Sequence, residues 1–298
     1  MTGSAAHFSG PDDVVDRFSE HDYLADRGLA TAVHLATTLG MPLLLEGEPG
    51  VGKTEAAKVL AASLGRPLVR LQCYEGLTAA EALYDWNHAR QLLAIRLAEA
   101  RGDRLQEADL FTEEYLQERP ILRCVRGAGG APAVLLIDEI DRADDEFEAL
   151  LLEFLGEQAV TVPELGTFRA SEPPVVVLTS NRSRDLHDAL RRRCLYHWLE
   201  FPSPERMVRI VRRRVPGASE PLVAAAADVV SGVRRLDLDK PPGLAEAVNW
   251  VAALTVLGVG ELVREDVTST LGALAKTPDD TEAVTGALDD LLAGTSAG

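Results

Sequence analysis

A glycine-rich turn that runs into a Lys-Thr pair has the chemistry needed to hold phosphate. Residues 47–54 read GEPGVGKT and match the pattern G-x-x-x-x-G-K-[ST]. Glycines let the main chain approach phosphate, Lys53 would neutralise the β- and γ-phosphates, and the Thr54 hydroxyl would ligate Mg²⁺. The alternative is a glycine turn without a ligand. The residues predicted to contact a nucleoside triphosphate are Gly47, Glu48, Pro49, Gly50, Val51, Gly52, Lys53, Thr54 and Glu55.

An Asp-Glu pair follows the uninterrupted apolar run of residues 133–138. Asp138 would hold Mg²⁺ through its water shell, and Glu139 would orient and deprotonate an attacking water molecule. The alternative is a strand that ends in a solvated acidic turn. The guanine-specifying sequence Asn-Lys-x-Asp does not occur, and a small-molecule kinase does not need a water-activating Glu directly after the Asp. The pair therefore indicates hydrolysis of ATP.

Polar and basic residues follow the next two apolar runs. Asn181 ends the run of residues 174–181, where its side chain could hold water between Glu139 and the γ-phosphate. The alternative is a Ser/Asn turn that ends a strand. Arg191 to Arg193 precede the last apolar run, and one of them could reach the γ-phosphate bound to a neighbouring subunit. Spacing alone favours the other interpretation, a solvated basic turn.

Apolar runs with the length of buried strands alternate with helical patterns up to about residue 202, and helical patterns alone follow. The expected strands are 42–46, 66–72, 133–138, 174–181 and 196–201. The expected helices include 22–39, 53–64, 78–100 and 144–155, with a hairpin at 159–170. Thr78 and Glu81 have the types and spacing of a capping box at the start of the third helix. This pattern predicts an α/β parallel sheet followed by a small α-helical domain.

Composition and net charge limit the cellular compartments and the classes of partner that we expect for this chain. The chain has 298 residues and a net charge of −17, which disfavours binding to nucleic acid and to anionic membranes. Its three cysteines lack metal or disulfide spacing, and no N-terminal signal peptide is visible. The apolar stretch 247–260 is too short to span a bilayer. We expect a cytoplasmic protein.

The motifs, in this order, resemble those of the AAA+ ATPases, specifically the MoxR group. Within it, the sequence is similar to CoxD-like members, which are associated with maturation of molybdenum–copper carbon monoxide dehydrogenase. The resemblance runs from about Leu24 to Leu254. It rests on LLLEGEPGVGKTEAAK, LQCYEGLTAAEALYDWNHARQLL, VLLIDEIDRAD, FLGEQAVTVPELG, VVLTSNRSRDLHDALRRRCLYHWLEFP and KPPGLAEAVNWVAAL.

This resemblance implies a P-loop AAA+ core with a five-stranded parallel sheet of order 5-1-4-3-2 and a helical lid. Its implied divisions are a flexible tail (1–20), a nucleotide-binding domain (21–202) and the lid (203–298). Asn181 would match sensor 1, and the arginine finger would be Arg193, with Arg192 as the second candidate. The segment 73–87 would face a client, or its Leu83 and Trp86 would simply pack.

One departure concerns the sensor 2 arginine that MoxR relatives carry early in a lid helix. Ala245 and Glu246 stand there instead, so either Arg234 or Arg235 substitutes or the lid senses the γ-phosphate weakly. The expected protein is a Mg²⁺-dependent ATPase that forms a hexameric ring. Its implied partners are a von Willebrand factor A-domain protein and a client metalloenzyme. The alternatives are a DNA-directed AAA+ motor and an ATP-binding scaffold with little turnover.

Overall fold

The structure is a computed structural model that describes residues 7–293 and divides into two compact units. The first contains the residues up to 21, residues 25–46 and residues 54–198. The second contains residues 22–24 and 47–53 and the residues from 199 onward. The predicted domain boundaries at residues 20 and 202 remain predictions.

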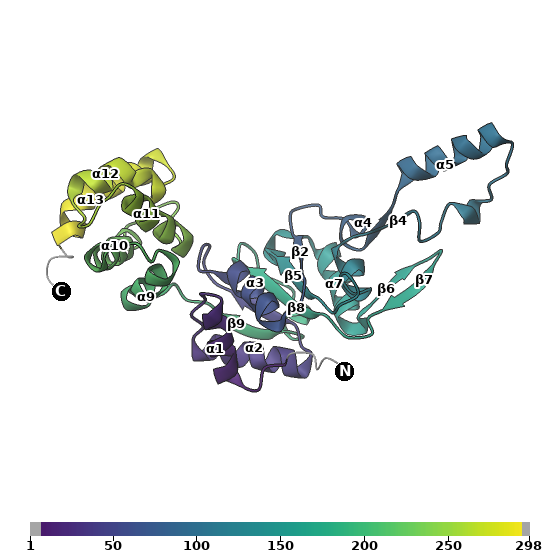
Figure 1. Cartoon of the computed structure of the whole chain (residues 1–298), viewed down its shortest axis with the longest axis horizontal. Coiled ribbons are helices and arrows are strands. Elements are labelled where there is room, and N and C mark those ends of the chain that lie inside the picture. Colours follow the sequence, from purple (N-terminus) through teal and green to yellow (C-terminus); the bar gives the residue numbers. More distant parts are fainter. Residues whose placement is uncertain (1–6, 294–298) are drawn as a thin grey trace. The chain divides into compact units, whose positions relative to one another are not determined.

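The first unit is built on a five-stranded parallel sheet (Figure 1). Its strands are β1 (Leu43–Glu46), β2 (Leu68–Gln72), β5 (Val134–Asp138), β8 (Val175–Ser180) and β9 (Leu195–Trp198). Their spatial order is β2-β5-β8-β1-β9. Counted from one to five along the chain, this is the order 5-1-4-3-2 that the sequence resemblance implied. All five residues of β5 are buried, as expected for an inner strand of a sheet covered on both faces.

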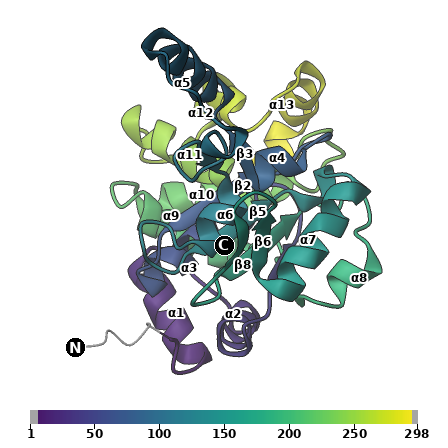
Figure 2. The same cartoon turned by 90° about the vertical axis from the view of Figure 1, so that its right-hand side faces the viewer.

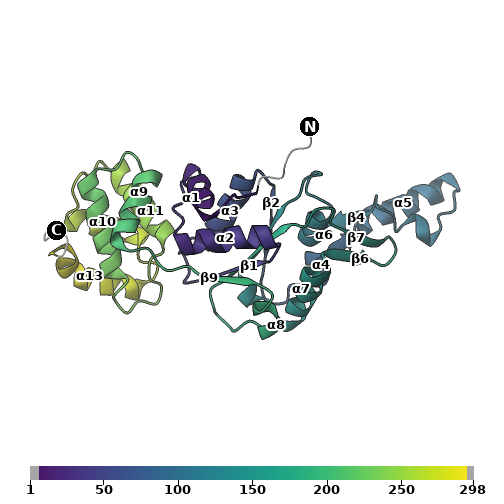
Figure 3. The ribbon, with the colours of Figure 1, turned by 90° about the horizontal axis from the view of Figure 1, so that it is seen from below.

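Helices cover both faces of this sheet. In Figures 2 and 3, α3 (Lys53–Leu64) and α7 (Asp145–Glu157) lie on opposite sides of it. Phe147 and Leu151 of α7 share one buried cluster with Leu135 and Ile137 of β5. Two further helices pack on the sheet: α2 (Arg27–Leu39) contacts β1 and β9, and α6 (Pro120–Val125) contacts β2 and β5. The short helix α8 (Asp188–Arg191) packs on α7. Burial of the apolar helix faces holds the strands' carboxyl ends in fixed positions.

Residues 78–100 do not form the single helix that their pattern predicts. They form α4 (Ala79–Ala82), β3 (Tyr84–Trp86) and most of α5 (His88–Arg101), which projects away from the sheet in Figure 1. The predicted capping box at Thr78 and Glu81 is present. The helix is interrupted because β3 pairs with β4 (Leu116–Glu118), a partner far along the chain. A short 3-10 helix, η1 (Glu107–Asp109), lies between α5 and β4.

Two side chains in this region bear on the predicted client-facing segment. Leu83 and Trp86 pack against the buried cluster of the first unit, as the packing alternative requires. Contact of the segment with a client remains a prediction. The predicted hairpin at 159–170 is present as β6 (Ala159–Val162) and β7 (Gly166–Arg169).

The expectation of a flexible tail over residues 1–20 is wrong for residues 11–20. These residues form α1 (Pro11–Glu20), which packs on α2. Val14 and Phe18 are fully buried, because their spacing of four residues places both on one helix face. Residues 1–6 of the predicted tail lie outside the described residues.

The second unit is helical from residue 204 onward, as the sequence pattern predicts. Its helices are α9 (Pro204–Arg214), α10 (Glu220–Val233), α11 (Leu244–Val256), α12 (Arg264–Thr270), η3 (Leu271–Ala273) and α13 (Pro278–Ala293). Trp250 is fully buried in the apolar cluster that these helices share, and its indole N–H donates to the Thr270 hydroxyl at 2.8 Å. Within residues 7–293, no helix combines the length and apolar character needed to cross a bilayer.

Candidate active site

The glycine-rich turn lies between the end of β1 at Glu46 and the start of α3 at Lys53. Gly50 and Gly52 have φ values of 78° and 101°, which are left-handed conformations that side chains make costly. The Lys53 ammonium group is buried and donates to the carbonyls of Gly47 at 2.7 Å and Glu48 at 2.8 Å. The turn therefore has the main-chain freedom and the positive charge that phosphate binding requires.

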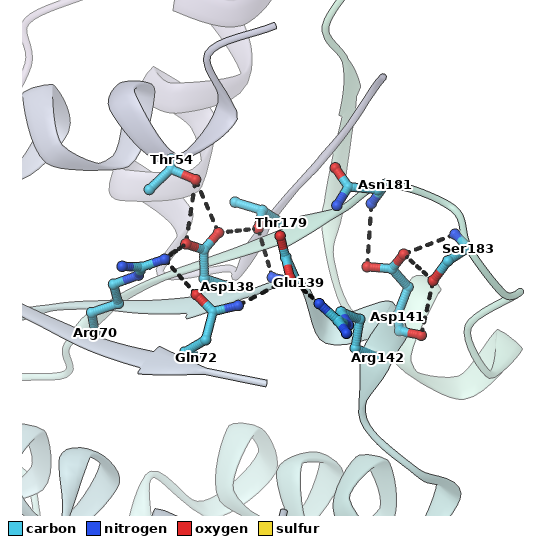
Figure 4. A network of polar contacts seen from close by, with 10 residues as sticks. All are labelled: Thr54, Arg70, Gln72, Asp138, Glu139, Asp141, Arg142, Thr179, Asn181 and Ser183. Atoms are coloured by element: carbon cyan, nitrogen blue, oxygen red, sulfur yellow. Dashed lines mark hydrogen bonds and ion pairs between the residues drawn. The ribbon is translucent and has the colours of Figure 1, made fainter. Parts of the chain in front are cut away.

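Thr54 and Asp138, the two predicted Mg²⁺ ligands, are in direct contact in the first unit (Figure 4). The Thr54 hydroxyl donates to Asp138 Oδ1 at 3.0 Å. Asp138 is buried, and it also accepts from the Thr179 hydroxyl at 2.5 Å and from the Arg70 Nε at 2.9 Å. Hydroxyl and carboxylate oxygens are ligands that Mg²⁺ prefers, so the residues present fit this ion.

Glu139 directly follows β5 and has an unusual main-chain conformation for a residue with a side chain. Its φ is 56°, and its N–H donates to the Thr179 hydroxyl at 2.9 Å. Gln72 Nε2 donates to its carboxylate at 3.1 Å, and Arg142 forms an ion pair with it at 3.3 Å. The turn and these two donors fix the carboxylate beside Asp138. Such strained positions occur often at functional sites.

Asn181 follows β8, next to the turn that carries Glu139 (Figure 4). Its main-chain N–H donates to Asp141 at 3.2 Å. Among the described residues, no group forms a hydrogen bond with its carboxamide. The structure therefore brings Thr54, Asp138, Glu139 and Asn181 to one edge of the sheet, and the Asn181 amide has free bonding capacity there.

The three consecutive arginines have different surroundings. Arg191 donates to the buried carboxylate of Glu46 at 3.0 Å. The Arg192 side chain is 82% exposed, and its guanidinium lies 3.9 Å from Asp188. Arg193 donates to the carbonyl of Leu152 at 2.5 Å. Arg192 and Arg193, the two finger candidates, therefore do not contact the site formed by their own chain's Asp138.

Arg234, a candidate substitute for the sensor 2 arginine, contacts the glycine-rich turn within the second unit. Its guanidinium forms an ion pair with Glu48 and donates to the carbonyl of Pro242 at 2.7 Å. It also stacks over the ring of Phe201 at 3.7 Å from the centroid. These contacts hold the guanidinium at residue 48 of the turn.

Five polar residues of this site were not predicted from the sequence: Arg70, Gln72, Asp141, Arg142 and Thr179. Arg70 and Gln72 alternate along β2 with apolar residues, which places both side chains on one face near its carboxyl end. That alternation was a usable signal, since the carboxyl ends of parallel strands meet at one edge. Asp141 and Thr179 had no comparable signal, because they act on distant main-chain N–H groups.

A parallel sheet of order 5-1-4-3-2, with a phosphate-binding turn after its first strand, defines a P-loop fold of the AAA+ class. The chain belongs to the AAA domain family, dynein-related subfamily, whose family model matches residues 42–194, just over half of the chain.

The chain is also similar to three known proteins. NorQ of Paracoccus denitrificans (strain Pd 1222) is 26% identical over 198 residues, which cover 64% of each chain. The denitrification regulatory protein NirQ of Pseudomonas aeruginosa is 25% identical over 264 residues, covering 85% of this chain and 89% of that protein. The chain thus spans slightly less than two thirds of NorQ. The RuvB Holliday junction branch migration motor of Thermotoga maritima has a TM-score of 0.47 and 19% identity, covering 88% of this chain and 71% of RuvB.

The AAA+ resemblance inferred from the sequence is confirmed by the family model, and the similarity to NorQ and NirQ agrees with its MoxR assignment. The narrower CoxD-like assignment remains a prediction.

Proposed function

We propose that this chain hydrolyses ATP in a Mg²⁺-dependent reaction. The observation that carries the proposal is the contact between Thr54 and Asp138, with Glu139 and Asn181 at the same sheet edge. A hydroxyl and a carboxylate side by side are what a nucleotide-bound Mg²⁺ needs, and a neighbouring carboxylate suits activation of water. Family membership supports the same chemistry.

Each side chain has one task in this proposal. Residues 47–55 bind the triphosphate through main-chain N–H groups, and Lys53 adds a positive charge. Thr54 and Asp138 hold Mg²⁺, which supplies charge neutralisation when bound. Glu139 accepts a proton from water, and the Asn181 carboxamide orients that water molecule.

We further propose that the chain assembles into a hexameric ring through contacts between identical subunits. Arg192 and Arg193 support this proposal, because neither contacts Asp138 of its own chain and Arg192 is largely exposed. A guanidinium that enters a neighbour's site would stabilise the charge that develops during phosphoryl transfer. Arg193 is the favoured finger, and Arg192 is the second candidate.

The proposed cellular role is remodelling of a client metalloenzyme during its maturation, in the cytoplasm. NirQ is named a denitrification regulatory protein, and that name supports a role in the assembly or control of an enzyme system. By sequence resemblance, the partner is a von Willebrand factor A-domain protein, and the client is an enzyme such as molybdenum–copper carbon monoxide dehydrogenase.

The competing proposals are a DNA-directed motor and a nucleotide-binding scaffold. The net charge of −17 opposes the first, because a chain so acidic repels the phosphate backbone. The Asp138-Glu139 pair opposes the second, because a scaffold needs no water-activating carboxylate. DNA-stimulated ATPase activity at physiological salt would favour the motor.

Measuring the ATP affinity and the steady-state turnover of the wild type and of two variants tests the proposal. The wild type should hydrolyse ATP. Lys53→Ala should lose nucleotide binding, whereas Glu139→Gln should keep it and lose at least about 100-fold in kcat. Unchanged affinity in the first variant or near-normal turnover in the second would contradict the assignments. A pull-down with Glu139→Gln in ATP would then identify the client.

A further inference from the structure

The main-chain N–H groups of Glu139 and Asn181 each donate to a side chain from the other's part of the chain. The Thr179 hydroxyl, at the end of β8, accepts the main-chain N–H of Glu139 at 2.9 Å. The Asp141 carboxylate, two residues beyond Glu139, accepts the main-chain N–H of Asn181 at 3.2 Å (Figure 4). A side chain at the end of β8 therefore fixes the main chain of Glu139, and a side chain of the turn after β5 fixes the main chain of Asn181.

Asp141 has no other evident task. It is buried and, among the described residues, no lysine, arginine or histidine forms an ion pair with it. Besides the Asn181 N–H, it accepts the Ser183 N–H at 2.8 Å and the Ser183 hydroxyl at 2.6 Å. A buried carboxylate is costly unless several donors satisfy it. All of its donors belong to the segment after β8.

The segment after β8 needs such an anchor. Arg182, between the two anchored residues, has a φ of 59°, a conformation that a long side chain rarely adopts. Its N–H donates to the Ser180 hydroxyl at 3.0 Å. Farther along, the fully buried carboxylate of Glu148 accepts the His187 N–H at 3.0 Å. The acceptors on either side of the strained residue therefore hold one defined main-chain path.

We propose that Asp141 is a positioning residue that fixes Asn181 relative to Glu139. It binds only the main chain of Asn181, so the carboxamide remains free to orient water while its Cα is held in place. The inference rests on the proposed ATP hydrolysis. Asp141 should therefore affect turnover and leave ATP affinity unchanged, since it touches none of the residues proposed to bind the triphosphate.

Asp141→Asn tests this assignment with little change in volume. Its amide offers one acceptor oxygen where the carboxylate offers two, and its NH₂ group would face an N–H donor. We expect an ATP dissociation constant within about twofold of wild type and a kcat at least about tenfold lower. Hydrogen exchange of a peptide that contains residues 181–183, measured without nucleotide, should accelerate at least about tenfold.

The matched control is Ser183→Ala, which removes the hydroxyl bond and keeps both main-chain bonds to Asp141. Its kcat should stay within about threefold of wild type. A loss as large as that of Asp141→Asn would overturn the role of the main-chain bonds. Unchanged kcat or unchanged exchange in Asp141→Asn would overturn the proposal itself.

Failure of Asp141→Asn to fold and absence of turnover in the wild type have different consequences for the proposal. If Asp141→Asn does not fold, Asp141→Glu keeps the charge, displaces the carboxylate by one methylene group and should show the same loss of kcat at constant affinity. A wild type without turnover would contradict the proposed function. The exchange rates would then still decide whether Asp141 holds this segment.

Discussion

Gln72 donates a hydrogen bond from its side-chain amide to the carboxylate of Glu139 at 3.1 Å. The two residues meet because β2 and β5 pair in parallel, with Gln72 opposite Asp138. Arg142 approaches the same carboxylate at 3.3 Å from within the turn after β5. Glu139 is therefore oriented by an adjacent strand as well as by its own turn.

Replacing Gln72 should impair turnover specifically. In Gln72→Ala, the Glu139 carboxylate keeps Arg142 as its only side-chain donor among the described residues, so its orientation toward water should be lost. We expect kcat to fall about tenfold while the ATP dissociation constant changes less than about twofold. Steady-state ATPase assays and titration with a fluorescent nucleotide would measure the two quantities. Gln117→Ala on β4 is the matched control, and equal effects in both variants would contradict this role.

Arg193→Ala should leave nucleotide binding intact and reduce the ATPase activity of the assembled protein by about 1,000-fold, if Arg193 completes a neighbour's site. Mixing it with Lys53→Ala subunits tests the geometry. The Lys53→Ala subunit retains Arg193, so it should restore turnover at the adjacent Arg193→Ala site.

The same mixing experiment with Arg192→Ala distinguishes the two finger candidates. Loss and rescue in Arg192→Ala alone would identify Arg192 as the finger. Absence of rescue in both mixtures would contradict a site shared between subunits.

Arg191→Ala should destabilise the fold. Glu46 is buried at the end of β1, and Arg191 supplies its 3.0 Å hydrogen bond, whereas Arg182 lies 3.8 Å away. We expect a loss of about 1–3 kcal/mol in the free energy of unfolding, because a buried carboxylate would lose its closest partner. Arg192→Ala, which removes a largely exposed side chain, should change it by less than about 0.5 kcal/mol. Urea unfolding would measure both, and equal midpoints would refute the difference.

The three cysteines should be unreactive in the folded protein. Burial raises the pKa of Cys73, Cys124 and Cys194 from 9.0 to about 12, and nearby Asp138 adds to the effect at Cys73. We expect almost no reaction with Ellman's reagent at pH 8 until the chain is unfolded, since the thiolate is the reactive form. Rapid reaction of the native protein would contradict this prediction.

The same thiols make stability depend on pH. The pKa of each thiol is higher in the folded protein than in the unfolded chain. The contribution of the thiols to the free energy of unfolding is therefore fully present below pH 9 and is lost as the pH rises toward 12. The unfolded chain releases these protons first. Each thiol should therefore remove about 1.4 kcal/mol of stability per pH unit in this window. Comparing Cys194→Ala with the wild type by urea unfolding at pH 8 and pH 10 isolates one thiol.

The candidate site was predictable where one short segment contains the whole chemical signal. The turn at 47–54 and the Asp138-Glu139 pair each follow a buried strand, and the parallel arrangement brings strand ends together. The prediction of secondary structure failed in one region, where a strand pairs with a partner far along the chain. Residues 78–100 have a helical pattern, but pairing of Tyr84–Trp86 with Leu116–Glu118 overrides it. Local periodicity carries no information about that partner.

The class of fold and the residue types of the site were predictable from the sequence, and family resemblance added the strand order. Those features depend on apolar periodicity and on short motifs, which are local properties of the chain. The partners of these residues became known from the folded chain: Gln72 binds the Glu139 carboxylate, Asp141 binds the Asn181 main chain, and Glu46, in place of solvent, binds Arg191. Hydrogen bonds between segments this far apart depend on sheet register and turn geometry, which no single segment specifies.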